Sequence, residues 1–334
     1  MDIWLSEHRT RNLIVAALLV ATIGFFAFGD WHFVWDKGMR YLLTRQNIIF
    51  TQNTGIYLIG IALVLLIEIP LLGWPQSSVY RLCHPSKSTI VDIVCFVIGI
   101  LKIGGIGILI FSLGLADLAL KLIDPVVPRG ILSVSNPLLQ MIWLLVAIDF
   151  CKYWIHVIQH KWKIWWELHK FHHAAEEFNV ITTSRDHPTD EAALAVALAV
   201  PFALLGGKAD QFLLLSVLFA MHAGLTHSML PWKFGWIGRW ILVSPIGHRI
   251  HHSAIPEQFD KNYGMVFIFW DRIFGTYYNG ALVNPTVTVS DNVYNKRSIF
   301  WDIIECPRRM LRAVFRRNLA GPAEKSANPA ATSA

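Results

Sequence analysis

The chain has 334 residues, of which 54% are hydrophobic and only 16% are charged, and its formal net charge is +6. Because soluble domains usually carry about 25% charged residues, this balance argues against an ordinary soluble protein and favours an integral membrane protein. The positive charge is spread too thinly to indicate a nucleic-acid partner, and it suits contact with anionic lipid headgroups.

Several apolar runs approach the roughly 20 residues that a membrane-crossing helix needs. We expect such spans at residues 12–29, 55–74, 90–123 and 137–160. Residues 12–29 also resemble a signal peptide, but no small-residue cleavage site follows them, which favours a retained helix. Two shorter runs, 190–206 and 210–228, are joined by a tight Gly-Gly-Lys-Ala turn and predict a helical hairpin.

Basic residues near the span ends predict the orientation, because cytoplasmic loops are enriched in lysine and arginine. The basic residues before the first span, those of the 74–89 loop and those of the 308–317 segment all favour the cytoplasm. The basic residues of the 30–54 loop disagree with this orientation, because that loop would then lie on the opposite side of the membrane. We therefore expect the region that follows residue 160 to lie on the cytoplasmic side.

Histidine is concentrated in that region, since 11 of the 14 histidines fall between residues 156 and 252. Metal binding needs several neutral imidazole nitrogens directed at one centre. The sequence therefore offers these candidate metal ligands: His156, His160, His169, His172, His173, His187, His222, His227, His248, His251 and His252.

The spacing of these histidines predicts three helical patches, because residues three or four apart share a helix face. One patch is H-x-x-x-H over 156–160, and the pattern H-x-x-H-H occurs twice, over 169–173 and 248–252. Each patch is expected to present its imidazoles in one direction. Eight histidines exceed the four ligands of one tetrahedral site, so the pattern favours two metal ions.

The residues by themselves leave the metal open, because imidazole suits zinc, copper, iron and nickel alike. The chain has no H-E-x-x-H motif of a zinc protease and no Glu-x-x-His pair of a carboxylate-bridged di-iron bundle. Acidic side chains are expected to orient the ring N–H groups, and the sequence does not choose among the candidates for this role. They are Asp149, Glu167, Glu176, Glu177, Asp186, Asp190, Glu257, Asp260 and Asp271.

Taken together, the three histidine patches on a chain with apolar spans resemble the fatty acid hydroxylase / sterol desaturase superfamily. The segments "RDHPTDE" at 185–191 and "DKNYGMVFIFWDRIFGTYY" at 260–278 are similar to further elements of that family. The resemblance covers residues 137–280 and does not extend to either end of the chain.

The resemblance implies an all-α integral membrane protein, with several transmembrane helices and a cytoplasmic-side helical cap that holds a dimetal site. We expect N-terminal transmembrane helices in 1–136, the di-iron catalytic domain in 137–280, and a basic segment with a disordered tail in 281–334. A bacterial inner membrane is the expected location.

The resemblance also implies a non-haem di-iron enzyme that uses O2 as co-substrate to hydroxylate or desaturate a lipid, with hydroxylation favoured. The expected cofactors are two iron ions, with zinc as a substitute in purified protein. The expected partners are a membrane lipid and a separate electron donor of ferredoxin or cytochrome type, and no nucleic acid. The eight patch histidines and His227 would be ligands, while His187 and His222 would ligate or support the ligands.

Metal transport is an alternative function of the chain, and contact with a lipid headgroup is an alternative role for Arg185. A membrane metal transporter would place ionisable residues in the middle of its spans, whereas residues 12–29, 55–67 and 93–101 carry no charge. Arg185 could meet a lipid headgroup, but a structural ion pair is the favoured interpretation.

Overall fold

The computed structural model describes residues 52–101, 121, 123, 125–281, 287–289 and 292–315. Within these ranges the chain forms α-helices and short 3-10 helices (η) and no β-strand, apart from two isolated bridges. The elements, in chain order, are α3 (Gln52–Leu72), η2 (Trp74–Gln76), α4 (Ser78–Cys83), α5 (Lys87–Leu101), α7 (Pro137–Lys161), α8 (Lys163–His173), η3 (Val180–Ser184), α9 (Pro188–Leu204), α10 (Ala209–Thr226), α11 (Gly235–Trp240), α12 (Pro245–His251), η4 (Pro256–Gln258), α13 (Phe269–Ile273) and α14 (Ile299–Phe315).

The expected helical class is therefore confirmed for the described residues, but the expected membrane topology is only partly tested. Among these residues, α7 is the one helix whose length and composition would let it cross a membrane. The span expected at 12–29, most of the run 90–123, and the tail 316–334 lie outside the described residues.

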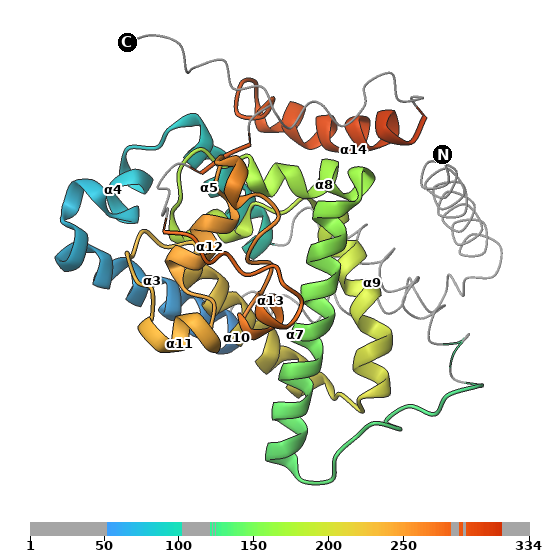
Figure 1. Cartoon of the computed structure of the whole chain (residues 1–334). Helices are drawn as coiled ribbons and strands as arrows, with labels where there is room; N and C mark the ends of the chain where they lie inside the picture. The colour runs from blue at the N-terminus through green and yellow to red at the C-terminus, as the bar shows by residue number, and fades with distance from the viewer. Residues whose placement is uncertain are drawn as a thin grey trace.

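Helix α7, with 25 residues, is the longest of the described helices, with α9 beside it and α8 near its upper end (Figure 1). It begins where the Asn136 side chain accepts hydrogen bonds from the backbone N–H groups of Leu138 and Leu139, with Pro137 at the first helical position. It ends at Trp162, whose extended backbone turns the chain into α8. Only Trp162 therefore separates the end of α7 from the start of α8.

Helices α9 and α10 form where the two shorter apolar runs predicted them. Gly206 lies in the turn between them with a φ of 71°, and a Cβ there would lie 2.7 Å from Ser133 Cβ, so the position requires glycine. α9 packs mainly along α7, whereas α10 packs against α3 and α12. The two helices thus place different neighbours around the end of α7.

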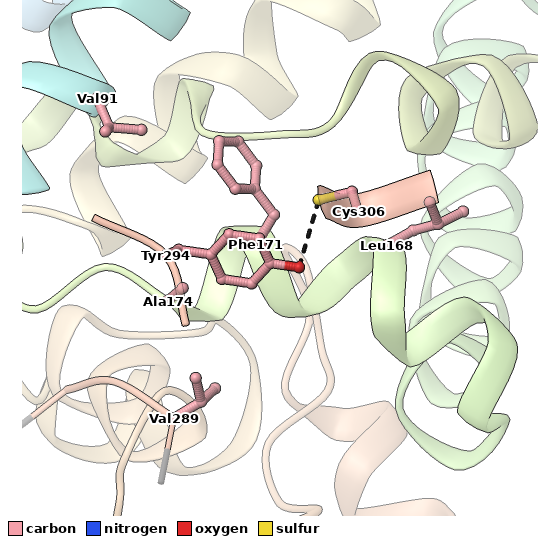
Figure 2. Close-up of a cluster of buried hydrophobic side chains, with 7 residues drawn as sticks. All are labelled: Val91, Leu168, Phe171, Ala174, Val289, Tyr294 and Cys306. Atoms are coloured by element: carbon pink, nitrogen blue, oxygen red, sulfur yellow. Dashed lines mark hydrogen bonds between the residues drawn. The ribbon is translucent and has the colours of Figure 1, made fainter. Parts of the chain in front are cut away.

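The inner face of α8 packs in an apolar cluster that joins distant parts of the chain (Figure 2). The thiol of Cys306 on α14 lies 3.5 Å from the Tyr294 hydroxyl within this cluster. The cluster fixes α14 along α8. Its buried members are Val91, Leu168, Phe171, Ala174, Val289, Tyr294 and Cys306.

Arg185 is fully buried and forms a structural ion pair, which confirms the interpretation favoured from the sequence. Its Nη1 lies 3.1 Å from Asp92 Oδ1, and its Nε donates to the Phe171 carbonyl at 3.0 Å. Asp92 also accepts hydrogen bonds from Asn179 and Thr182. These contacts connect α5, η3 and α8, so the pair holds the end of α8 in position.

Candidate metal centre

Nine of the eleven candidate histidines converge at the ends of α7, α8 and α10 and along α12. Their ring nitrogens form two groups, and the candidate ligand atoms within each group all lie within 4.8 Å of one another. The five-histidine group comprises His156, His160, His169, His173 and His251, and the four-histidine group comprises His172, His227, His248 and His252.

Each H-x-x-H-H patch is divided between the two groups, which differs from the expectation that a patch would point in one direction. His169 and His173 join the five-histidine group, whereas His172 joins the other. In the second patch, His248 and His252 join the four-histidine group, whereas His251 joins the five-histidine group. Residues four apart on a helix differ by about 40° around the axis, whereas adjacent residues differ by about 100°, so the middle histidine faces another centre.

The two groups are adjacent to each other. The rings of His173 and His252, one from each group, stack with centroids 4.0 Å apart. Within the four-histidine group, His227 Nε2 lies 3.3 Å from His172 Nε2 and 3.1 Å from His248 Nε2. Two neighbouring centres of imidazole nitrogens are therefore built from both patches together.

The inward-facing nitrogens of these rings have the character expected of ligand atoms. The Nε2 atoms of His160, His169, His173 and His251 are buried and have no hydrogen-bond partner within the described residues. Both ring nitrogens of His252 are also buried and have no hydrogen-bond partner among the described residues. Because an unpartnered buried polar atom is costly, such a concentration of them fits a site that binds a cation.

The outward-facing nitrogens are held by fixed acceptors. The Nδ1 atoms of His156 and His251 lie 2.7 and 2.8 Å from the backbone carbonyls of Tyr263 and Lys261. His169 Nδ1 lies 3.1 Å from Asp190 Oδ2. Such acceptors fix the tautomer, so the other nitrogen carries the lone pair that a metal needs.

The aspartates differ in what they do. Asp190 meets His169, and Asp186 lies 3.2 Å from His172 Nδ1. Asp149 instead accepts hydrogen bonds from the backbone N–H groups of Val266 and Phe267, so it ties the segment after α12 to α7. That segment supplies the two carbonyl acceptors, for which the sequence gives no side-chain signal.

Burial keeps five of these histidines neutral. Burial, followed by the neighbouring imidazoles, holds the pKa values of His173, His248 and His252 well below the usual range. Burial likewise lowers the pKa values of His227 and His251 to about 3. All five rings are therefore neutral at pH 7, which is the ligand form.

His187 and His222 lie outside both groups. His187 Nε2 lies 3.0 Å from the Ile303 carbonyl of α14, and its ring meets the edge of Phe171. The His222 ring is hydrogen-bonded to the backbone of Val243, and its Nε2 is buried with no hydrogen-bond partner among the residues that the structure describes. Ligation by these two residues remains a prediction that neither group supports.

The donor set fits a pair of borderline transition-metal ions. Every candidate ligand atom is an imidazole nitrogen, a type that binds iron, zinc, copper and nickel. The two groups offer five and four nitrogens, enough for two ions. The nine histidines above would hold them, while the Asp190 carboxylate and the two backbone carbonyls would orient the rings.

We predict that Asp190→Asn weakens metal binding by about 10–100-fold, because His169 would lose the carboxylate that fixes its tautomer and raises its basicity. The measurement is iron affinity by competition with a chelator. Glu257→Gln, at an exposed acidic position, is the control and should retain wild-type affinity. Equal affinities for both variants would contradict this role of Asp190.

Comparison with known proteins identifies the region that contains this centre. Residues 141–276 match the pattern of a family described as fatty acid hydroxylase. Alkylglycerol monooxygenase of Xenopus tropicalis is 33% identical over 141 residues, which is 40% of this chain and 30% of that protein.

Two other relatives are named for different activities. Ornithine lipid hydroxylase of Rhizobium tropici is 31% identical over 140 residues, 42% of each chain. Delta(7)-sterol 5(6)-desaturase of Aspergillus fumigatus is 32% identical over 145 residues, 42% of this chain and 39% of that protein. The chain thus spans well under half the length of these three relatives, and no solved structure is significantly similar to it. Residues 141–276, which contain all nine converging histidines, therefore match a fatty acid hydroxylase domain.

Proposed function

We propose that this protein is a membrane-bound, O2-dependent lipid oxygenase that hydroxylates a C–H position of a lipid at a di-iron centre. The observation that carries the proposal is the pair of adjacent histidine groups, which together offer nine imidazole rings. Bound iron would supply the activation of O2, which side chains cannot perform alone.

The chain's own residues would hold, orient and isolate the centre. In the overall reaction one oxygen atom of O2 enters the lipid and the other leaves as water, so two electrons and two protons must be supplied. We propose a separate ferredoxin- or cytochrome-type donor for the electrons. The apolar environment of α7 and α10 suits a lipid chain that approaches from the bilayer side.

The names of the relatives support a lipid substrate and are consistent with two reaction types, hydroxylation and desaturation. Two of the three are named as a monooxygenase and a hydroxylase, which favours hydroxylation. The third is named as a sterol desaturase, so desaturation on the same centre is the second candidate. We propose a multi-pass location in a bacterial inner membrane, with the histidines at the cytoplasmic end of α7.

The test is lipid profiling of cells that express the chain or its His251→Ala variant under isotopically labelled O2. Hydroxylation predicts a lipid that gains one labelled oxygen atom in wild-type cells alone, whereas desaturation predicts a lipid that loses two hydrogens. If a sample shown to contain two irons changes no lipid when a reducing system is supplied, the oxygenase proposal is wrong. A metal-binding or transport protein would then be favoured.

A further inference from the structure

The loop at residues 260–264 presents two backbone carbonyls to the five-histidine group. The Lys261 and Tyr263 carbonyls accept the Nδ1–H groups of His251 and His156, at 2.8 and 2.7 Å respectively. Asn262, which lies between them in the chain, has a left-handed conformation with a φ of 56°, and asparagine tolerates this conformation better than most residues. Two carbonyls of one loop therefore hold two rings of one histidine group.

A buried carboxylate binds the same loop. Asp271 of α13 is fully buried, and its Oδ1 accepts the Tyr263 N–H at 2.7 Å and the Thr276 hydroxyl at 2.6 Å. Its Oδ2 accepts the Gly264 N–H at 2.8 Å. A Cβ at position 264 would lie 2.9 Å from this Oδ2 and 2.6 Å from the Phe267 carbonyl oxygen, so the close approach requires glycine. Both oxygens of the carboxylate therefore bind one short stretch of backbone.

A single peptide unit joins this carboxylate to a candidate ligand. The Tyr263 carbonyl and the Gly264 N–H belong to the same peptide bond, which is planar and trans, so the two groups point in opposite directions. The N–H donates to Asp271, and the carbonyl accepts from His156. A chain of two hydrogen bonds thus runs from the carboxylate through a rigid peptide to the imidazole. Rotation of that peptide would break both bonds at once.

This chain offers His156 the kind of support that His169 receives directly. Asp190 contacts His169 Nδ1, whereas one peptide separates Asp271 from His156. Hydrogen bonds in a chain polarise one another, so a carboxylate at one end makes the carbonyl at the other end a stronger acceptor. A stronger acceptor fixes the tautomer of the ring and raises the basicity of the nitrogen that would bind a metal.

We propose that Asp271 is a positioning residue for His156, and that it acts through the peptide between Tyr263 and Gly264 to support one ligand of the five-histidine group. This inference rests on the proposed metal centre. It gives the segment 260–278 a task at that centre. Loss of a direct outer partner lowers metal affinity by about 10–100-fold, and we expect the lower end, about tenfold, for a carboxylate that acts through a peptide.

The test is a double-mutant cycle on the full-length protein in nanodiscs, with Fe²⁺ as the probe and its stepwise affinities measured by anaerobic competition with a chelator. Asp271→Asn keeps the size of the side chain but offers one acceptor oxygen where two backbone N–H groups need two. It should lower one of the two affinities about tenfold. In a His156→Ala background, four rings of the group remain, and the same substitution should cause no further loss because the ring on which Asp271 acts is gone.

Two controls separate this role from a general loss of structure. Asp190→Asn acts on a different ring, His169, and should lower the affinity by the same factor with and without His156. Thr276→Val removes the hydroxyl that Asp271 accepts but keeps both backbone N–H bonds, so it should keep the wild-type affinity. If Asp271→Asn does not fold, Asp271→Glu takes its place in the cycle. It keeps the charge, displaces the two oxygens by one methylene and should show the same dependence on His156.

An equal loss of affinity for Asp271→Asn in both backgrounds would show that Asp271 supports the fold in general and would overturn the inference. Unchanged affinity in the background that keeps His156 would overturn it too. In either case a wild-type protein that binds two ions would leave the metal centre intact. A wild-type protein that binds no iron would instead overturn the metal centre and the inference together. Because turnover is not measured, no outcome depends on which lipid is oxidised.

Discussion

His248→Ala is expected to reduce the iron content of the purified protein from about two ions per chain to about one. His248 belongs to the four-histidine group, in which every ring is needed to reach four ligands. His251→Ala removes one ring from the five-histidine group and leaves four. We therefore expect His251→Ala to retain more iron than His248→Ala. Elemental analysis of both variants, after equal exposure to a chelator, makes the comparison.

Lipid oxidation should fall by more than about 100-fold in both variants, since even loss of an outer hydrogen-bond partner costs 10–100-fold in affinity or activity. His84→Ala is the matched control, because His84 is exposed and contacts Tyr80 on α4, far along the chain from both groups. It should keep both iron ions. If His248→Ala retained two ions and His84→Ala did not differ from it, the four-histidine group would not be a metal site.

The convergence of the patch histidines could be predicted from the sequence, because their spacing is a local property of short helices. All eight patch histidines and His227 converge in the structure. The division of each patch was not predicted, although helix geometry contains it. His169 and His173 share a face, and His172 lies about 100° from His173. This angle is enough to predict that each patch contributes histidines to both groups.

Contacts between distant segments could not be predicted in the same way. The carbonyls that hold His156 and His251 belong to Tyr263 and Lys261, and a backbone carbonyl leaves no mark in a sequence. Arg185 and Asp92 are 93 positions apart, so no periodicity relates them. The favoured interpretation of Arg185 as half of an ion pair was right, but its partner came from the fold.

Arg185→Met is expected to be the most destabilising single change outside the histidine groups. Removal of one partner of a buried ion pair leaves the other charge unpaired and costs about 3–5 kcal/mol. Arg185 and Asp92 are both fully buried, and the guanidinium also donates to the Phe171 carbonyl. By the usual conversion for a domain of this size, the Tm should fall by roughly 6–20 °C. Thermal unfolding of the detergent-purified protein measures it.

Arg308→Met is the matched control, since Arg308 pairs with Glu305 at 3.3 Å on the surface and its side chain is 53% exposed. Its Tm should stay close to wild type, because exposed pairs contribute little. Asp92→Leu combined with Arg185→Met should recover part of the lost stability by removing both charges. A Tm for Arg185→Met within measurement error of the control would contradict a structural role for the pair.

The loss of the Arg185 side chain should also weaken metal binding at the histidine groups. The Phe171 carbonyl that Arg185 holds directly precedes His172 and His173 at the end of α8. Without that contact, the two rings lose the anchor of their helix end, and one of them serves each histidine group. We therefore expect Arg185→Met to bind iron more weakly even below its Tm. Iron retained fully at a temperature where the variant is folded would show that α8 keeps its histidines in place without Arg185.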